Sequence, residues 1–380
     1  MDQVPYSPPK PFKFFNFWIK HQEFQKIVEK SWIEPLNSVP MILLHKKLKR
    51  LKQCLKEYNK EYFAGISLKV KAKRAKLVVV QEEILSGNTG IGLVQHERTL
   101  TQEFYSLMHM EESFYKQKSR IQWLKEEDSN TNFFHKLVMV RQNRNTISTM
   151  IDSEGNKLST FLQMEKEAIR YFQNLLGIED DEVTGCPSTV LAEVVNTIPA
   201  AAQDELVKPV TQKEIKSTIF TIGGEKALGP DGYTAIFFKA AWPIVGGDVV
   251  NAIMHFFQTG YIIPAFNSTI VALVPKCKNP NSTKDFKSIS CCSVIYKCIT
   301  KILANRLQRF LPYIIGKNQS AFTTGRSISD NIFMAQELVK GYGRTTISPR
   351  RAIKVDLQKA FDLLNWKFVL DVLEIGRAHV

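Results

Sequence analysis

The chain has 380 residues, of which 44% are hydrophobic and 11% aromatic, so it has ample apolar side chains for packed cores and is not a disordered chain. Its six cysteines are sparse and irregularly spaced, which excludes a disulfide framework and indicates a reducing compartment. No stretch approaches the ~18 consecutive apolar residues of a membrane span, and the absence of CxxC pairs and of paired histidines argues against zinc.

The formal charge of +14 is unevenly distributed along the chain. Residues 1–150 hold 25 Lys and Arg against 15 Asp and Glu, residues 151–250 hold 8 against 15, and residues 251–350 hold 13 against 3. Because basic surfaces attract polyanions and contact phosphates, the pattern favours a nucleic-acid partner over a small neutral ligand. An ordinary solvated basic surface is the alternative. Prolines and lysines interrupt the start of the chain, unlike a signal peptide, so we expect an intracellular protein of the nucleus or cytoplasm.

The first 18 residues combine prolines with aromatic side chains. Prolines at positions 5, 8, 9 and 11 forbid a regular helix, and the stretch KPFKFFNFW then ends at Trp18. This composition predicts a packing arm or last strand from another domain.

Residues 19–177 are expected to be mainly helical. Apolar residues recur at helical spacing among lysines over residues 40–63, which predicts an amphipathic basic helix. A second long helix is expected over residues 95–124, after a break at residues 86–92. Two interpretations stay open, a helical hairpin with solvated lysines and an RNA-binding surface.

The end of this region predicts a small hairpin, a helix and a linker. Residues 147–158 have the pattern of a hairpin, and residues 159–176 that of a helix closed by Gly177. Residues 178–206 begin with a run of Glu and Asp and include glycine and proline, which indicates an acidic linker and a domain boundary.

The second half alternates helices with single strands, which predicts the α+β class. Thr211 and Glu214 form a possible capping box for a helix that ends near residue 222. The remaining pattern predicts helices over residues 237–258, 294–311, 329–342 and from 365, and strands over residues 268–274 and 351–356.

The segment RAIKVDLQKAFDLLNW, residues 351–366, carries the clearest chemical signal. A β-branched run places Asp356 at the end of the predicted strand, and Phe361 follows five residues later. In a nucleotide polymerase, a carboxylate held at a strand end can ligate one of two Mg²⁺ ions. A helix cap or turn residue is the alternative for such an aspartate.

Four collinear blocks in the second half resemble the conserved blocks of plant LINE-type reverse transcriptases, which belong to non-LTR retrotransposons. The blocks are KALGPDGYTAIFFK from residue 226, STIVALVPKCKNPNSTKDFKSISCCSVIYKCITKILANRL from 268, QSAFTTGRSISDNI from 319, and the segment with Asp356. The stretches KPFKFFNFW and SRIQWLKEEDSNTNFFHK resemble the join between the endonuclease and polymerase of such elements.

This resemblance implies a partial right-hand polymerase with RNA template, DNA primer and dNTP as partners. Residues 1–18 would be the end of an endonuclease domain, residues 207–349 the fingers and residues 350–380 the start of the palm. Asp356 would be the catalytic, Mg²⁺-binding aspartate of the first palm motif, and Phe361 the steric gate against a ribose 2′-hydroxyl. Lys276 and Arg326 resemble basic positions near template or nucleotide, and residues 229–232 resemble the family's Gly-Pro-Asp-Gly turn.

Two departures from the family pattern affect these expectations. Lys287 and Ser288 stand where the family usually has Arg-Pro, and a lysine cannot reproduce the bidentate grip of arginine on phosphate. After Leu373 the chain reads EIGRAHV, where the family continues towards its second aspartate box. Two-metal catalysis needs several converging carboxylates, so we expect a truncated and inactive polymerase. A silent nucleic-acid-binding remnant and a non-expressed pseudogene fragment are the alternatives.

Overall fold

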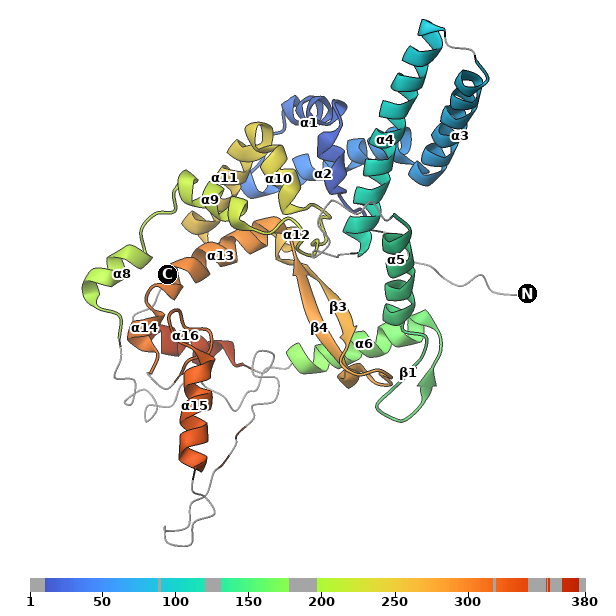
Figure 1. Cartoon of the computed structure of the whole chain (residues 1–380). Helices are drawn as coiled ribbons and strands as arrows, with labels where there is room; N and C mark the ends of the chain where they lie inside the picture. Colours follow the sequence, from blue (N-terminus) through green and yellow to red (C-terminus); the bar gives the residue numbers. More distant parts are fainter. Residues whose placement is uncertain are drawn as a thin grey trace. The chain divides into compact units, whose positions relative to one another are not determined.

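A computed structural model describes residues 11–87, 90–119, 131–177, 197–316, 319–340, 353, 355 and 364–375. Over these residues the protein is mainly helical, with two small two-stranded sheets (Figure 1). One sheet pairs β1 (Met150–Ile151) with β2 (Lys157–Leu158), and the other pairs β3 (Thr269–Pro275) with β4 (Phe286–Cys292). The predicted α+β class is consistent with this content.

The chain divides into two compact units, each built from two separate stretches of sequence. Unit 1 contains residues 1–150 and 211–298, and unit 2 contains residues 151–210 and 299–380. The first half of the chain contributes the helices η1 (Asn16–Lys20), α1 (Glu23–Ile33), α2 (Pro40–Tyr58), η2 (Asn59–Phe63), α3 (Ile66–Leu85), α4 (Ile91–Ser119), α5 (Thr131–Asn145) and α6 (Phe161–Leu176). The second half contributes α8 (Ala200–Leu206), α9 (Gln212–Thr221), α10 (Ala235–Ala240), α11 (Trp242–Thr259), α12 (Pro264–Asn267), η3 (Thr283–Asp285), α13 (Val294–Gln308), α14 (Leu311–Ile314), α15 (Ile328–Val339) and α16 (Trp366–Ile375).

The basic helix predicted over residues 40–63 is confirmed. Pro40 begins α2, since its fixed φ suits a first helical position and its missing N–H is not needed there. A single π-helical turn, η2, continues the helix to Phe63. One face of α2 is buried against α1 and α11, and its buried residues are Met41, Leu44, Leu48, Leu51, Leu55 and Tyr58. Their spacing at three and four residues is that of an amphipathic helix.

One carboxylate joins the three packed helices α1, α2 and α11. Asp248 on α11 accepts a 2.7 Å hydrogen bond from Trp32 Nε1 on α1 and forms a 2.7 Å ion pair with Lys47 Nζ on α2. The two interactions neutralise the carboxylate of Asp248 and connect α11 to both neighbouring helices.

Several predicted elements agree with the structure. Residues 147–158 form the β1–β2 hairpin, and the hydroxyl of Thr160 accepts the backbone N–H of Gln163 to cap α6. Thr211 caps α9 in the same way, by accepting the N–H of Glu214. The predicted helix over residues 95–124 corresponds to α4, which begins earlier, at Ile91.

The single helix predicted over residues 237–258 is wrong, because the structure has two helices there. α10 ends at Ala240 and α11 begins at Trp242, with Pro243 in its first turn. Proline has no N–H to donate to the preceding turn, and its ring disfavours helical backbone before it. The first helix therefore ends at Ala240, and a new helix begins at Trp242.

Other elements have no counterpart in the sequence prediction, or different ends. The helix predicted over residues 294–311 ends at Gln308, and the short α14 follows with Pro312 in its first turn. The sequence analysis did not predict the helices α1, α3, α5 and α8 or the strand β4. The linker predicted over residues 178–206 contains α8, while residues 178–196 and the strand predicted over 351–356 lie outside the described residues.

Unit 2 has a small core of its own. Ile198, Leu206 and Phe310 are buried together, with partly buried Leu307 and Leu373 packed against them. The guanidinium of Arg306 donates to the carbonyls of Leu206 and Lys208 at the end of α8, at 3.0 and 2.6 Å. Since the last carbonyls of a helix have no partner within it, this side chain completes the end of α8.

The Gly-Pro-Asp-Gly turn at residues 229–232 is packed between backbones in unit 1. A Cβ on Gly229 would overlap the backbone of Cys292 and Ser293, where β4 passes into α13. Gly232 has a φ of +80° and a Cβ there would overlap the carbonyl of Phe12. Its carbonyl accepts the N–H of Phe14 at 2.9 Å, so the aromatic arm of residues 11–18 packs directly on the turn. Whether this arm once ended an endonuclease domain stays a prediction.

Replacement of Gly232 by alanine is therefore expected to destabilise the chain by about 3 kcal/mol, because it combines a positive φ with steric overlap. Gly247 on α11 is the matched control, since a Cβ there meets nothing within 4 Å. Gly247→Ala should instead stabilise the helix by about 0.5 to 1 kcal/mol. Urea unfolding followed by circular dichroism measures both, and equal effects of the two substitutions would contradict this account of the turn.

Candidate nucleic-acid interface

The β3–β4 ribbon places two of the predicted site residues on one face. The strands pair antiparallel with Val274 opposite Lys287, and the N–H of Lys276 donates to the carbonyl of Asp285 at 2.8 Å, which extends the ladder. Side chains alternate along a strand, and paired residues share a face. Val274, Lys276 and Lys287 therefore lie on the same face of the ribbon, and both lysines are exposed.

The two lysines differ in what they already contact. Lys276 Nζ donates to the carbonyl of Lys284 at 2.9 Å and so helps to close the loop between the strands. In the same loop, hydrogen bonds from the N–H groups of Ser282 and Asn281 lower the pKa of Asp285, with a smaller contribution from Lys276. The ammonium group of Lys287 makes no hydrogen bond or ion pair with any residue that the structure describes. It is the cation of this face that is available to an anionic partner.

Arg326 lies in unit 2, where its guanidinium holds the backbone of a turn. It donates to the carbonyls of Ile315 at 3.1 Å and Gln319 at 2.6 Å, and also to that of Gly316. Arginine has five N–H donors, so some remain for a phosphate. The nucleotide contact expected for this residue stays a prediction.

Asp356 and Phe361 lie outside the described residues. Within the part of the chain that the structure describes, no group of three or more His, Cys, Asp or Glu side chains could hold a metal ion. The metal-binding and steric-gate roles therefore stay predictions.

The carboxyl group of Asp231, which the sequence analysis treated only as part of a turn, lies near the end of the ribbon. Asp231 is half-buried, its Oδ1 accepts the N–H of Tyr233 at 3.4 Å, and its buried Oδ2 has no hydrogen-bond partner among the described residues. Burial raises the pKa of Asp231 to about 6, while backbone hydrogen bonds and the nearby Lys297 and Lys52 partly oppose that rise. Burial likewise lowers the pKa of both lysines.

No local pattern could have revealed this cluster, because its members come from three distant segments. Lys52 lies on α2, Asp231 in the turn and Lys297 on α13. The Nζ of Lys52 is 5.3 Å from the ring centre of Phe12, and that of Lys297 donates to the carbonyl of Ala227 at 2.5 Å. The cluster joins helices around the turn and serves the fold of unit 1.

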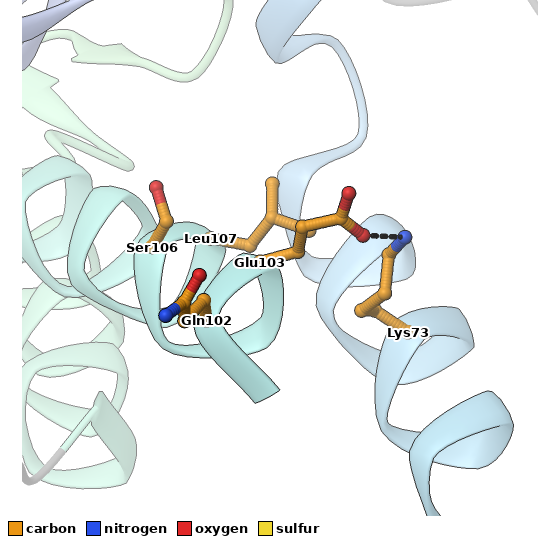
Figure 2. Close-up of a pocket in the computed structure, with 5 residues that line it drawn as sticks. All are labelled: Lys73, Gln102, Glu103, Ser106 and Leu107. Atoms are coloured by element: carbon orange, nitrogen blue, oxygen red, sulfur yellow. Dashed lines mark hydrogen bonds and ion pairs between the residues drawn. The ribbon is translucent and has the colours of Figure 1, made fainter. Parts of the chain in front are cut away.

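The surface hollow between α3 and α4 is a weaker candidate site. Figure 2 shows Lys73 reaching from α3 to Glu103 on α4, where their side chains form a 2.6 Å ion pair. Gln102, Ser106 and Leu107 complete the lining. The ion pair connects the two helices. No general base lies next to the Ser106 hydroxyl in this lining, so the hydroxyl is not activated as a nucleophile.

Comparisons with known proteins identify one matching family model and two similar proteins. Residues 274–375 match the family model named reverse transcriptase (RNA-dependent DNA polymerase). The transposon TX1 uncharacterized 149 kDa protein of Xenopus laevis is 26% identical over 257 residues, which cover 68% of this chain and 19% of that protein. The retrovirus-related Pol polyprotein from type-1 retrotransposable element R2 of Bradysia coprophila is 24% identical over 221 residues, 58% of this chain and 24% of that protein.

The chain thus spans about a fifth to a quarter of the length of these relatives. Neither organism supports the expected plant origin. No helix among the described residues is both long and apolar enough to cross a bilayer.

The pKa of Asp231 has a direct consequence for stability. Because this pKa is raised from 3.8 to about 6, the protonated carboxyl contributes to the stability of the folded chain. That contribution is fully present below pH 4 and is lost as the pH rises through 6. Asp231→Asn keeps the Oδ1 acceptor without the charge, so it should stabilise the chain at pH 7.5 by roughly 2 to 3 kcal/mol and have little effect at pH 4.

Urea unfolding of both forms from pH 4 to 8 measures the difference. Asp285→Asn is the opposite control: the pKa of Asp285 is lowered, so its contribution is present at neutral pH and lost as the pH falls. A stability gain for Asp231→Asn that does not change with pH would exclude titration of this carboxyl as its cause.

Proposed function

Because residues 274–375 form a reverse transcriptase segment of the non-LTR retrotransposon type, as the sequence motifs predicted, we propose that this chain binds template and nucleotide as part of an RNA-directed DNA polymerase. The observation that carries the proposal is the cationic face of the β3–β4 ribbon. Val274, Lys276 and Lys287 all lie inside the segment that matches the family.

The face suits a nucleic-acid backbone for physical reasons. Lysine ammonium groups replace the counterions of phosphates, and this release supplies much of the affinity for nucleic acids. Val274 and Ile289, each about two-fifths exposed, lie on the same face as Lys287 and offer apolar contact to sugars and bases beside the charges. A phosphate contact by Lys287 costs no existing bond among the described residues, whereas Lys276 must share its ammonium with the loop carbonyl.

The finer assignments complete the proposal. Residues 207–349 serve as fingers and residues 350–380 as the start of a palm, with RNA template, DNA primer and dNTP as partners. Reverse transcriptases use a divalent metal, which activates the primer hydroxyl and neutralises the triphosphate. Asp356 is the residue of this chain that would hold Mg²⁺, Phe361 the residue that would exclude a ribose 2′-hydroxyl, and Arg326 a further phosphate contact.

Template binding is tested by replacing Lys287 with glutamine. Loss of one phosphate contact should weaken binding of an RNA–DNA hybrid several-fold at low salt and reduce the slope of log K against log salt by about 1. Filter binding across salt concentrations measures both values.

Lys166→Gln provides the control, because Lys166 is an exposed lysine on α6 and is not part of the ribbon. If Lys287→Gln and Lys166→Gln lower affinity and slope equally, binding is diffuse and the ribbon is not the interface. If the unchanged chain does not bind at any salt concentration, the whole proposal is rejected.

Polymerase chemistry is tested separately, by primer extension on an RNA template with all four dNTPs and Mg²⁺. We expect no extension by this chain, since two-metal catalysis needs several converging carboxylates and Asp356 alone cannot hold both ions; extension that Asp356→Ala lowers by about 100-fold or more would overturn this expectation. Asp330→Ala on α15 is the matched control, because it removes an exposed side chain of the same residue type, and any extension should survive it. Extension that survives Asp356→Ala would reject the metal-binding role, and hybrid binding without any extension would leave only the binding function.

A further inference from the structure

Helix α3 carries apolar residues on two opposite faces. Leu77 and Val80 are buried, and with Ile84 they pack against Leu100 and Phe104 of α4. This contact accounts for one face of the helix and forms the α3–α4 hairpin (Figure 1).

The second apolar face of α3 is exposed. Leu68, Ala72, Ala75 and Val79 follow one another at spacings of four, three and four residues, which places them in one stripe. Leu68 is 71% exposed and Val79 53% exposed, and both alanines are exposed as well. A helix turns about 100° per residue, so Ala75 points roughly 200° away from Leu77 and the stripe faces away from α4.

The charges beside this stripe change sign along the helix. Lys71 and Glu82 are about three turns apart and lie on one flank, while Lys76 and Glu83 are about two turns apart and lie on the other. All four side chains are exposed, and none forms a hydrogen bond or ion pair with the residues that the structure describes. The first half of each flank is therefore basic and the second half acidic.

We propose that this stripe is the surface through which two copies of the chain associate, with their α3 helices antiparallel. About a two-fold axis near residues 76 and 77, Lys71 of each copy lies level with Glu82 of the other, so both ion pairs form on the same flank. Ala75 then meets Val79 at the centre, where the small side chain lets the helices approach to about 8 to 10 Å. Leu68 comes level with Leu85, which is 86% exposed in one copy.

Charge complementarity is what selects this occupant. A parallel pair would bring the basic first halves of the two helices against each other, with the flank of Lys71 facing the flank of Lys76, and a nucleic acid would leave Leu68 and Val79 exposed to water. An acidic helix of another protein would oppose Glu82 and Glu83. The antiparallel second copy matches the sign of the charge in both halves of the helix.

The test is sedimentation velocity of the full chain over a range of concentrations. We expect a reversible dimer that Lys71→Glu weakens by about 10-fold, since the substitution replaces two attractions with two repulsions. Glu82→Lys should weaken it equally, and the chain with both substitutions should recover the original association constant within about threefold. In a parallel pair, Lys71→Glu would instead place an acidic side chain against the basic half of the other helix and strengthen the association.

Two further variants separate association from folding. Ala75→Arg places a charge in the stripe and should abolish the dimer while leaving the melting temperature of the monomer unchanged, because the residue is exposed in a single copy. Lys46→Glu on α2 makes the same charge change as Lys71→Glu outside the stripe and should have no effect on association. A chain that stays monomeric at about 100 μM, a dimer that tolerates Ala75→Arg, or single reversals that the double variant does not rescue would each overturn the proposal.

Discussion

Two glycines in the turn at residues 229–232 let three distant segments touch backbone to backbone, and unit 1 depends on that contact. Gly229 lies against the junction of β4 and α13, and Gly232 lies against the arm at Phe12. Any Cβ at either position would push a backbone away, which a tightly packed interior does not accommodate without cost. The turn therefore links the amino-terminal arm to the base of the ribbon that carries Lys287.

Tyr233, directly after the turn, extends this contact into the core. Its buried ring lies 5.5 Å from that of Phe12 and 4.6 Å from that of Phe237, measured between ring centres. Its hydroxyl donates to the carbonyl of Leu48 on α2 at 2.8 Å, so one side chain connects the arm, the turn and the basic helix. Asp231 is half-buried in the same place at an electrostatic cost, which is why its pKa is raised. The close packing of this turn therefore reduces the solvation of the Asp231 carboxylate.

The same packing affects how the basic residues are to be understood. Lys276 and Arg326, both expected to contact nucleic acid, donate to backbone carbonyls of neighbouring loops. The side chain of Lys287 has no such bond within the described residues, so its ammonium group stays available to an anionic partner. On α3, Lys73 is paired with Glu103, whereas Lys71 and Lys76 beside the exposed stripe are not paired within the part of the chain described.

The sequence by itself determined the elements with strong local signals and the resemblance to reverse transcriptases. Helix α2 follows from the spacing of its leucines, α6 from the pattern that Gly177 closes, α9 from its threonine cap, and the reverse transcriptase resemblance from the order of four blocks. These signals are local, so each can be read without knowing what it packs against. Strand β4, whose residues FKSISCC include the polar side chains of Lys287, Ser288 and Ser290, was not predicted because its pairing with β3 decides its conformation. Only the tertiary structure could show that Lys276 and Lys287 share one face of the ribbon and that Asp231 lies near Lys52 and Lys297. It also decided that one stripe of α3 stays uncovered. Each of these features depends on which segments pack together, and no local pattern in the sequence specifies that.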